Sequence, residues 1–196
     1  MSEETSNKPS VQKTASQKFL ARPLGIVGTI WGVAGAITLL SFALSRMTGH
    51  MLEAFSGEYP LGVWHYVVAV LWTFFMAYSE GYKGFQKGYS PRVAARALYL
   101  RDKCTWLRLF LAPLFCLGFF HSTKRRRIVV FVLLIVITLI VMLFKYIPQP
   151  WRGLLDLGVV VGLSWGIIAT VVFLIKFWTA KEVPYDPEVV EPTLST

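Results

Sequence analysis

Four long apolar stretches separated by polar segments dominate the pattern of this chain. They cover residues 23–44, 59–79, 128–147 and 157–177, and none holds more than one lysine, arginine, aspartate or glutamate. Each is close to the roughly 20 residues that an α-helix needs to cross a hydrocarbon layer about 30 Å thick. Because lipid offers no partner to backbone groups, each stretch is expected to be helical. The pattern predicts an all-α, polytopic membrane protein with a four-span helical bundle.

The two ends of the chain lack this apolar pattern. Residues 1–22 are polar and carry lysines, whereas residues 179–196 are acidic and contain several prolines. Such compositions are typical of disordered segments, so both ends are expected to be disordered tails that flank a transmembrane domain at 23–178. The first apolar stretch begins late and lacks a small-residue cleavage site after it, so it is interpreted as an uncleaved span.

Residues 90–120 form an amphipathic segment between the second and third spans. Ser90 followed by Pro91 is typical of a helix start. Apolar residues then recur every three or four positions from Val93 to Leu111, with arginines on both sides, and Pro113 is expected to end the helix. An apolar stripe with basic residues on both sides predicts a helix that lies in the membrane plane, with the apolar stripe facing the acyl chains. Residues 104–120 are expected to re-enter or lie at the interface rather than cross.

Three glycines lie just before this segment, in the sequence GYKGFQKG at residues 81–88. Glycine is unfavourable inside a helix by about 1 kcal/mol, so a tight turn between span and surface helix is the favoured interpretation. The alternative is an anion site, in which backbone amides and Lys83 or Lys87 receive a headgroup. No nucleotide-binding motif matches, and no predicted strand precedes the glycines.

The net charge of +9 comes from one part of the chain, because residues 80–127 hold eleven lysines and arginines against two acids. The positive-inside rule then predicts that this part and both tails are cytoplasmic. The expected location is a bacterial inner membrane or an organellar equivalent. Basic clusters beside spans attract anionic lipids. The candidates for headgroup binding are Lys83, Lys87, Arg92, Arg96, Lys103, Arg108, Lys124, Arg125, Arg126 and Arg127.

Composition narrows the possible functions. The chain is 55% hydrophobic and only 16% charged, and its two cysteines match neither a disulfide framework nor a zinc pattern. No catalytic motif, metal site or cofactor site is found, and anionic lipid explains the basic charge better than nucleic acid does. His50 and His65 could meet on the outer side, but two histidines make a weak metal site.

Glycines four residues apart mark two helix faces. They are Gly28 and Gly32 in the first span, and Gly158, Gly162 and Gly166 in the last. Such faces let helix backbones approach closely, so the two are predicted to pack against one another or across a homodimer. Asp156 lies one turn after Arg152, and this spacing predicts a structural ion pair.

By elimination, the sequence favours a non-enzymatic accessory, assembly or organising protein. It would engage anionic phospholipid headgroups and a protein partner or a second copy of itself. The alternative is a small membrane enzyme or transporter subunit that acts on a lipid-like substrate at the cytoplasmic face. In that case, Glu80 and His121 would supply acid–base chemistry and would have to reach one common atom.

Overall fold

The computed structural model describes residues 9–120, 122–180, 185–187 and 189, and these are almost entirely helical, with no strand among them. Three helical segments are long and apolar enough to cross a membrane: Pro23–Ala54 within α1 (Pro9–Ala54), Arg127–Phe144 within α6 (Lys124–Phe144), and all of α7 (Trp151–Thr179). The second apolar stretch is different because its α-helix, α2, has only 14 residues, Val63–Met76. The all-helical class is therefore confirmed, and three helices are suited by length and composition to cross a membrane, whereas the count of four spans stays a prediction.

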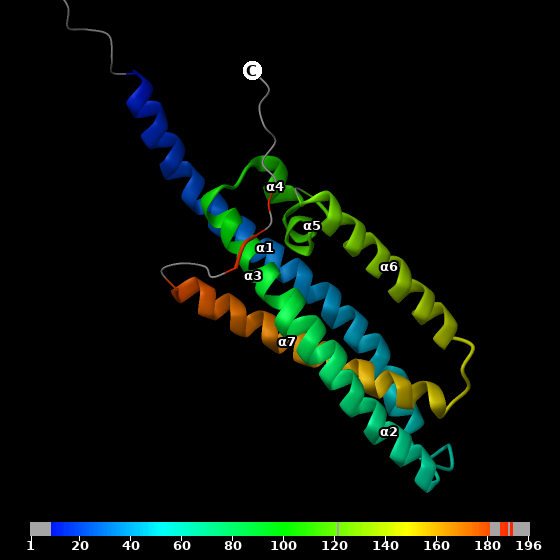
Figure 1. Cartoon of the computed structure of the whole chain (residues 1–196). Helices are drawn as coiled ribbons and strands as arrows, with labels where there is room; N and C mark the ends of the chain where they lie inside the picture. Colours follow the sequence, from blue (N-terminus) through cyan, green and yellow to red (C-terminus); the bar gives the residue numbers. More distant parts are fainter. Residues whose placement is uncertain (1–8, 121, 181–184, 188, 190–196) are drawn as a thin grey trace, which may run out of the picture.

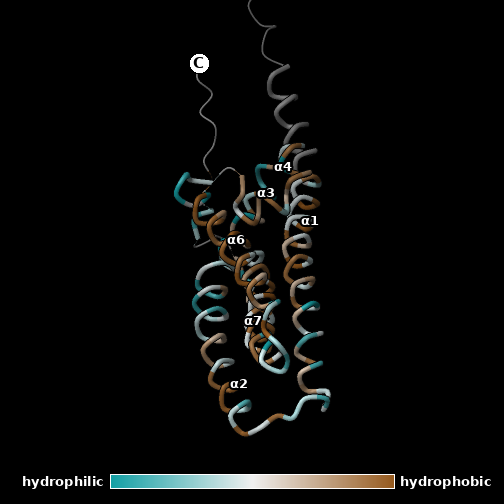
Figure 2. The backbone as a smooth tube through the Cα atoms, turned by 90° about the vertical axis from the view of Figure 1, so that its right-hand side faces the viewer, coloured by the Kyte–Doolittle hydropathy of each residue, from teal (hydrophilic) through white to brown (hydrophobic). Residues whose placement is uncertain are grey.

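One continuous helix runs from Val63 to Asp102, where a turn was predicted. It consists of α2, a π-helix η1 (Ala77–Tyr89) and α3 (Ser90–Asp102), and the backbone stays helical at both junctions. Figure 2 shows apolar α2 giving way to the more polar η1 above it. Ser90 is consequently not the start of a separate helix, since its N–H donates to the carbonyl of Phe85 five residues earlier. The prediction of a tight glycine turn is therefore wrong: this segment is a π-helix, which has more residues per turn than an α-helix.

The α3 helix is the centre of the packed core, not a surface helix. Val93, Ala97 and Leu100 are at most 2% exposed and form a cluster with residues of α1 and of the short helix α5 (Ala112–Leu117). The opposite side of α3 packs on Phe177 of α7. Alanines at the contact positions let three helices approach α3 closely. The expected stripe therefore faces protein, and the prediction that it contacts acyl chains is wrong for α3.

The segment after α3 breaks twice. The backbone leaves helical geometry at Lys103, and Thr105 caps the short helix α4 (Trp106–Phe110), because its hydroxyl accepts from the N–H of Arg108. A second break at Leu111 precedes α5, as expected from Pro113. Helices of five and six residues are far too short to cross a bilayer. The chain then turns at Gly118, whose φ of +90° suits glycine.

The α6 helix lies apart from the others along one side of the molecule, as Figure 1 shows. Its contact with the rest includes an edge-to-face ring pair of Phe131 with Phe119 and the approach of Val130 to Gly118. The 18-residue apolar part of α6 has no buried residue, so almost its entire surface is free to face lipid.

Part of the acidic C-terminal segment packs on the protein. Tyr185 lies near the ring of Phe177, and Val189 forms an isolated antiparallel bridge with Ser122. Disorder was predicted for residues 179–196, and these described residues differ from that prediction because aromatic and backbone contacts hold them. The predicted N-terminal tail, residues 1–22, differs as well: α1 begins at Pro9, and residues 1–8 lie outside the described residues.

Candidate functional site

The π-helix carries an outward ladder of lysines and tyrosines. The ammonium of Lys83 lies 4.9 Å from the centre of the Tyr78 ring, and that of Lys87 lies 4.6 Å from the Tyr82 ring. The two tyrosine rings stack with their centroids 6.0 Å apart. Residues five apart lie about 140° from each other on an α-helix, whereas π winding brings them onto one side. The winding therefore creates the ladder, and both lysines are exposed.

The opposite side of the same segment packs against the glycine face of α7. A Cβ at Gly158 would lie 2.6 Å from the Trp72 indole, and one at Gly166 would lie 2.5 Å from the Phe85 ring. At Gly162 the near atom is Oε2 of Glu80, at 2.9 Å. Gly158, Gly162 and Gly166 thus admit α2 and η1, not the first span or a second copy.

The glycines of the first span have a different neighbour as well. A Cβ at Gly28 would lie 3.1 Å from Sγ of Cys104, and one at Gly32 would lie 2.6 Å from Sγ of Cys116. Both glycine faces are close-packed against other parts of the monomer. The prediction that the two faces pack against one another is therefore wrong. The face of Gly28 and Gly32 admits residues of the 90–120 segment, which was predicted to lie at the membrane surface.

Arg96 is a buried structural arginine and not a headgroup ligand. Its side chain is 3% exposed, and it donates to the carbonyls of Phe115 (2.8 Å), Phe120 (2.7 Å) and Pro187 (3.2 Å). Its guanidinium also lies 4.7 Å from the Phe115 ring centre. A buried guanidinium is tolerated when several acceptors surround it, and here three backbone carbonyls do so. This removes Arg96 from the predicted headgroup set.

A second basic and aromatic surface surrounds α4. The side chains of Trp106, Leu107 and Phe110 are 76%, 65% and 82% exposed. Beside them, the cations of Lys103 and Arg108 both lie over the ring of Tyr99, at 5.6 and 5.5 Å, and Arg108 also donates to the carbonyl of Lys103. We call Lys103, Trp106, Leu107, Arg108 and Phe110 the α4 patch.

The remaining basic candidates are divided between two places. Lys124, Arg125 and Arg127 are exposed in the first turn of α6, and the side chain of Arg126 lies outside the described set. Arg92 is half-buried and lines a small cavity of about 10 Å³ together with Arg96 and Gly118. Arg92 therefore lies beside Arg96 at this cavity, whereas the exposed cations of α6 lie on the surface.

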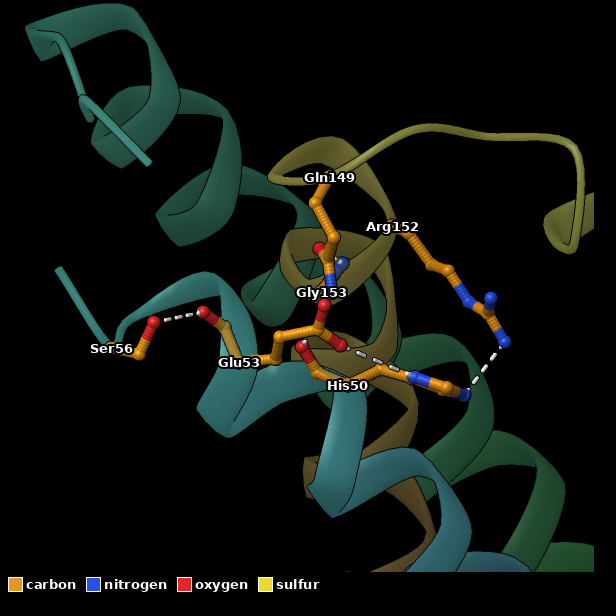
Figure 3. A network of polar contacts seen from close by, with 6 residues as sticks. All are labelled: His50, Glu53, Ser56, Gln149, Arg152 and Gly153. Atoms are coloured by element: carbon orange, nitrogen blue, oxygen red, sulfur yellow. Dashed lines mark hydrogen bonds and ion pairs between the residues drawn. The ribbon is translucent and has the colours of Figure 1, made fainter. Parts of the chain in front are cut away.

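A polar network joins α1 and the start of α7 at the other end of the molecule (Figure 3). The guanidinium of Arg152 lies 2.6 Å from Nε2 of His50. The side-chain amide of Gln149 donates to the carbonyl of His50 (3.2 Å) and accepts from the N–H of Gly153 (3.0 Å). His50 in turn lies 3.9 Å from a carboxylate oxygen of Glu53. This network anchors the end of α1 to α7.

The predicted Arg152–Asp156 ion pair is replaced by the contact of Arg152 with His50. Asp156 is 1% exposed, and neither of its carboxylate oxygens has a hydrogen-bond partner among the described residues. The spacing of four residues is compatible with a pair, but the Arg152 side chain extends toward α1 instead. Sequence spacing cannot show this choice, because His50 is about a hundred positions away.

In the described part of the chain, no group of three or more His, Cys, Asp or Glu side chains is placed to hold a metal ion. His65 contacts the Trp151 ring and accepts from the N–H of Gly62, so it is held in a packing role. The acid–base pair suggested for an enzyme involves His121, which lies outside the described residues. Its partner Glu80 turns one oxygen inward against Gly162.

Both cysteines lie in the short segments near α3. Burial raises the pKa of the Cys116 thiol to about 12, and the nearby Arg96 offsets only part of this effect. Burial also raises the pKa of Cys104, with a smaller opposing effect of Arg108. Neither environment activates a thiolate, so the structure gives no support to a reactive cysteine.

No protein-family model, curated protein or solved structure matches this chain.

Proposed function

We propose that this protein is a non-enzymatic membrane accessory or organising protein that engages anionic phospholipid headgroups at the end of the bundle formed by α3–α6. Three helices that are long and apolar enough to cross a membrane support the membrane placement. The proposal includes two further points: α2 is part of a fourth span, and both termini lie in the cytoplasm. The position of the termini is based on the charge distribution.

The α4 patch is the observation that carries this proposal. Three large apolar side chains project from a single short helix, and two cations lie beside them. Tryptophan and phenylalanine prefer the boundary between headgroups and acyl chains, and lysine and arginine beside them reach the phosphates. Packing explains why these side chains are not in the core, since α3 and α5 already fill it.

The first turn of α6 adds to the same surface chemistry. Its exposed Lys124, Arg125 and Arg127 directly precede the apolar stretch that ends at Phe144. Each cation near an anionic leaflet contributes about 1 kcal/mol of attraction. The glycine faces are filled within the monomer, so the proposal is supported by the exposed apolar and basic side chains and not by those faces.

A spin-label accessibility experiment tests the proposal. In a variant with Cys104 and Cys116 changed to Ala, a label is attached at Phe110→Cys, with Glu58→Cys in the exposed loop after α1 as the control. We expect the label at 110 to collide with oxygen in vesicles of phosphatidylglycerol and phosphatidylcholine, whereas the label at 58 collides with a water-soluble nickel chelate. Changing Lys103 and Arg108 to Gln should move the label at 110 toward water. Equal insertion in pure phosphatidylcholine would contradict the preference for anionic headgroups.

A further inference from the structure

An apolar groove lies on the outside of the bundle, between α2 and α7. Its volume is about 410 Å³, and Phe55, directly after α1, is one of its lining residues. On α2 the lining residues recur at helical spacing from Tyr66 through Val70 and Thr73 to Ala77, which is the first residue of η1. Leu157 and Val161 form the α7 side. The groove therefore follows the helix upward and ends where η1 begins.

The upper end of the groove meets the polar part of the long helix. Trp165 follows Val161 by one turn of α7, so it lies above the groove on the same helix side. Its indole packs within 3.1 Å of where a Gly81 side chain would begin, and it donates to Oε1 of Gln86 at 2.8 Å. A Cβ at 81 would make this contact tighter than an ordinary van der Waals contact, so the indole would have to shift slightly. The indole thus contacts η1 one turn beyond the groove.

Lys83 and Lys87, the two lysines of the ladder on η1, lie close to the upper end of the groove along the helix axis. Lys83 is six residues beyond Ala77, which is less than about 10 Å along a helix axis. Lys83 and Lys87 are both exposed, and each lies over a tyrosine ring. A ring contact holds an ammonium in place while leaving N–H donors free for a phosphate. Positive charge therefore lies less than about 10 Å along the helix axis from the upper end of a hydrocarbon-lined groove.

We propose that one anionic phospholipid binds here, with an acyl chain in the α2–α7 groove and its phosphate at Lys83 and Lys87. This inference rests on the proposed function, since it names one specific lipid site within a protein that engages anionic lipids. Charge complementarity indicates the occupant. A hydrocarbon chain without a phosphate would fill the groove but leave the two lysines without a counter-charge. A free phosphate would bind the lysines but leave the groove empty.

Native mass spectrometry tests the site on the full chain, released from nanodiscs of equimolar phosphatidylglycerol and phosphatidylcholine. The wild-type protein should retain one phosphatidylglycerol. Val161→Phe fills the groove and should abolish retention of this lipid, whereas Ile168→Phe, at a position 64% exposed on α7, should not. Lys83→Gln with Lys87→Gln should lower the preference for phosphatidylglycerol about thirtyfold, because each lysine contributes about 1 kcal/mol, and Lys145→Gln should leave it unchanged. A thermal melt of each variant establishes that it is folded.

The outcomes separate this inference from the proposed function. If Val161→Phe or the double lysine variant retains phosphatidylglycerol as the wild type does, the site is overturned, even if the α4 patch inserts as expected. If groove and lysine variants lose the lipid while Phe110 stays in water, the site stands and the α4 patch proposal fails. Equal retention of both lipids by the wild-type protein would overturn the role of the lysines.

Discussion

The ammonium of Lys87 lies 4.6 Å from the centre of the Tyr82 ring, five residues earlier in the chain. In an α-helix, Tyr82 would instead share a side with Gln86. The contact between Lys87 and Tyr82 is therefore a consequence of the π winding of η1. The same winding places the lysines of this segment outward and turns Glu80 and Phe85 inward against α7.

Double-mutant cycles measure this relationship. Combining Tyr82→Leu with Lys87→Met should give a coupling of about 0.5–1 kcal/mol in the free energy of unfolding, the range of an exposed cation–π contact. The cycle of Tyr82→Leu with Gln86→Ala serves as the control and should give none. A larger coupling for the second pair would show that residues 77–89 wind as an ordinary α-helix.

Close packing at Gly166 gives the second prediction. Gly166→Ala should lower the free energy of unfolding by about 2 kcal/mol, because the new Cβ would lie 2.5 Å from the Phe85 ring and η1 would have to move. Gly49→Ala in α1 is the matched control, since nothing lies within 4 Å of a Cβ there and alanine favours the helix. Thermal unfolding in a mild detergent measures both, and equal melting temperatures would contradict the tight α7–η1 contact.

The third prediction concerns the three carbonyls that accept from Arg96. Arg96→Lys keeps the charge but cannot reach all three acceptors, so the free energy of unfolding should fall by about 2 kcal/mol. Because one of the acceptors is Pro187, protease cleavage near Tyr185 should also become faster. Arg92→Lys, on the same helix and half-buried, is the control for both measurements. Unchanged proteolysis in the Arg96 variant would argue against the contact with Pro187.

Several features of the fold follow from local sequence pattern. The apolar periods predicted helices, the break before α5 follows from Pro113, and the glycines of α7 marked a close-packed face. These features depend on residues near one another in the chain. Their partners could not be predicted, because glycine spacing shows that a backbone can approach and not which one does.

The segment at 77–102 shows why other features were missed. A single glycine costs about 1 kcal/mol in a helix, and this predicted a turn. Contacts with α7 across about eighty residues offset that cost, as in the packing of Gly81 on Trp165. Two sequence signals were present: the Tyr–Lys pairs five residues apart, and the alanines beside Arg96, which are typical of a helix buried on several sides.

Cysteine reactivity gives the fourth prediction. Only the thiolate reacts with maleimide, and burial raises the pKa of Cys116 to about 12, so its labelling should be negligible at pH 8 and should rise only as the pH approaches that value. Cys104 is less buried, and its raised pKa predicts slow labelling at pH 8 that accelerates with increasing pH. The variants Cys116→Ala and Cys104→Ala isolate each site. Rapid labelling of Cys116 at pH 7 in the folded protein would contradict its burial.

The last prediction concerns the side of the membrane on which α6 begins. The positive charge of Lys124, Arg125 and Arg127 favours the cytoplasmic side, and α4 and α5 are too short to carry the chain across. With Cys104 and Cys116 changed to Ala, Lys124→Cys should resist an impermeant maleimide in sealed right-side-out vesicles and react once they are opened. Glu58→Cys, in the loop between α1 and α2, should react in the sealed vesicles. Modification of both sites before opening would reverse the second half of the topology and place the α4 patch away from the anionic leaflet.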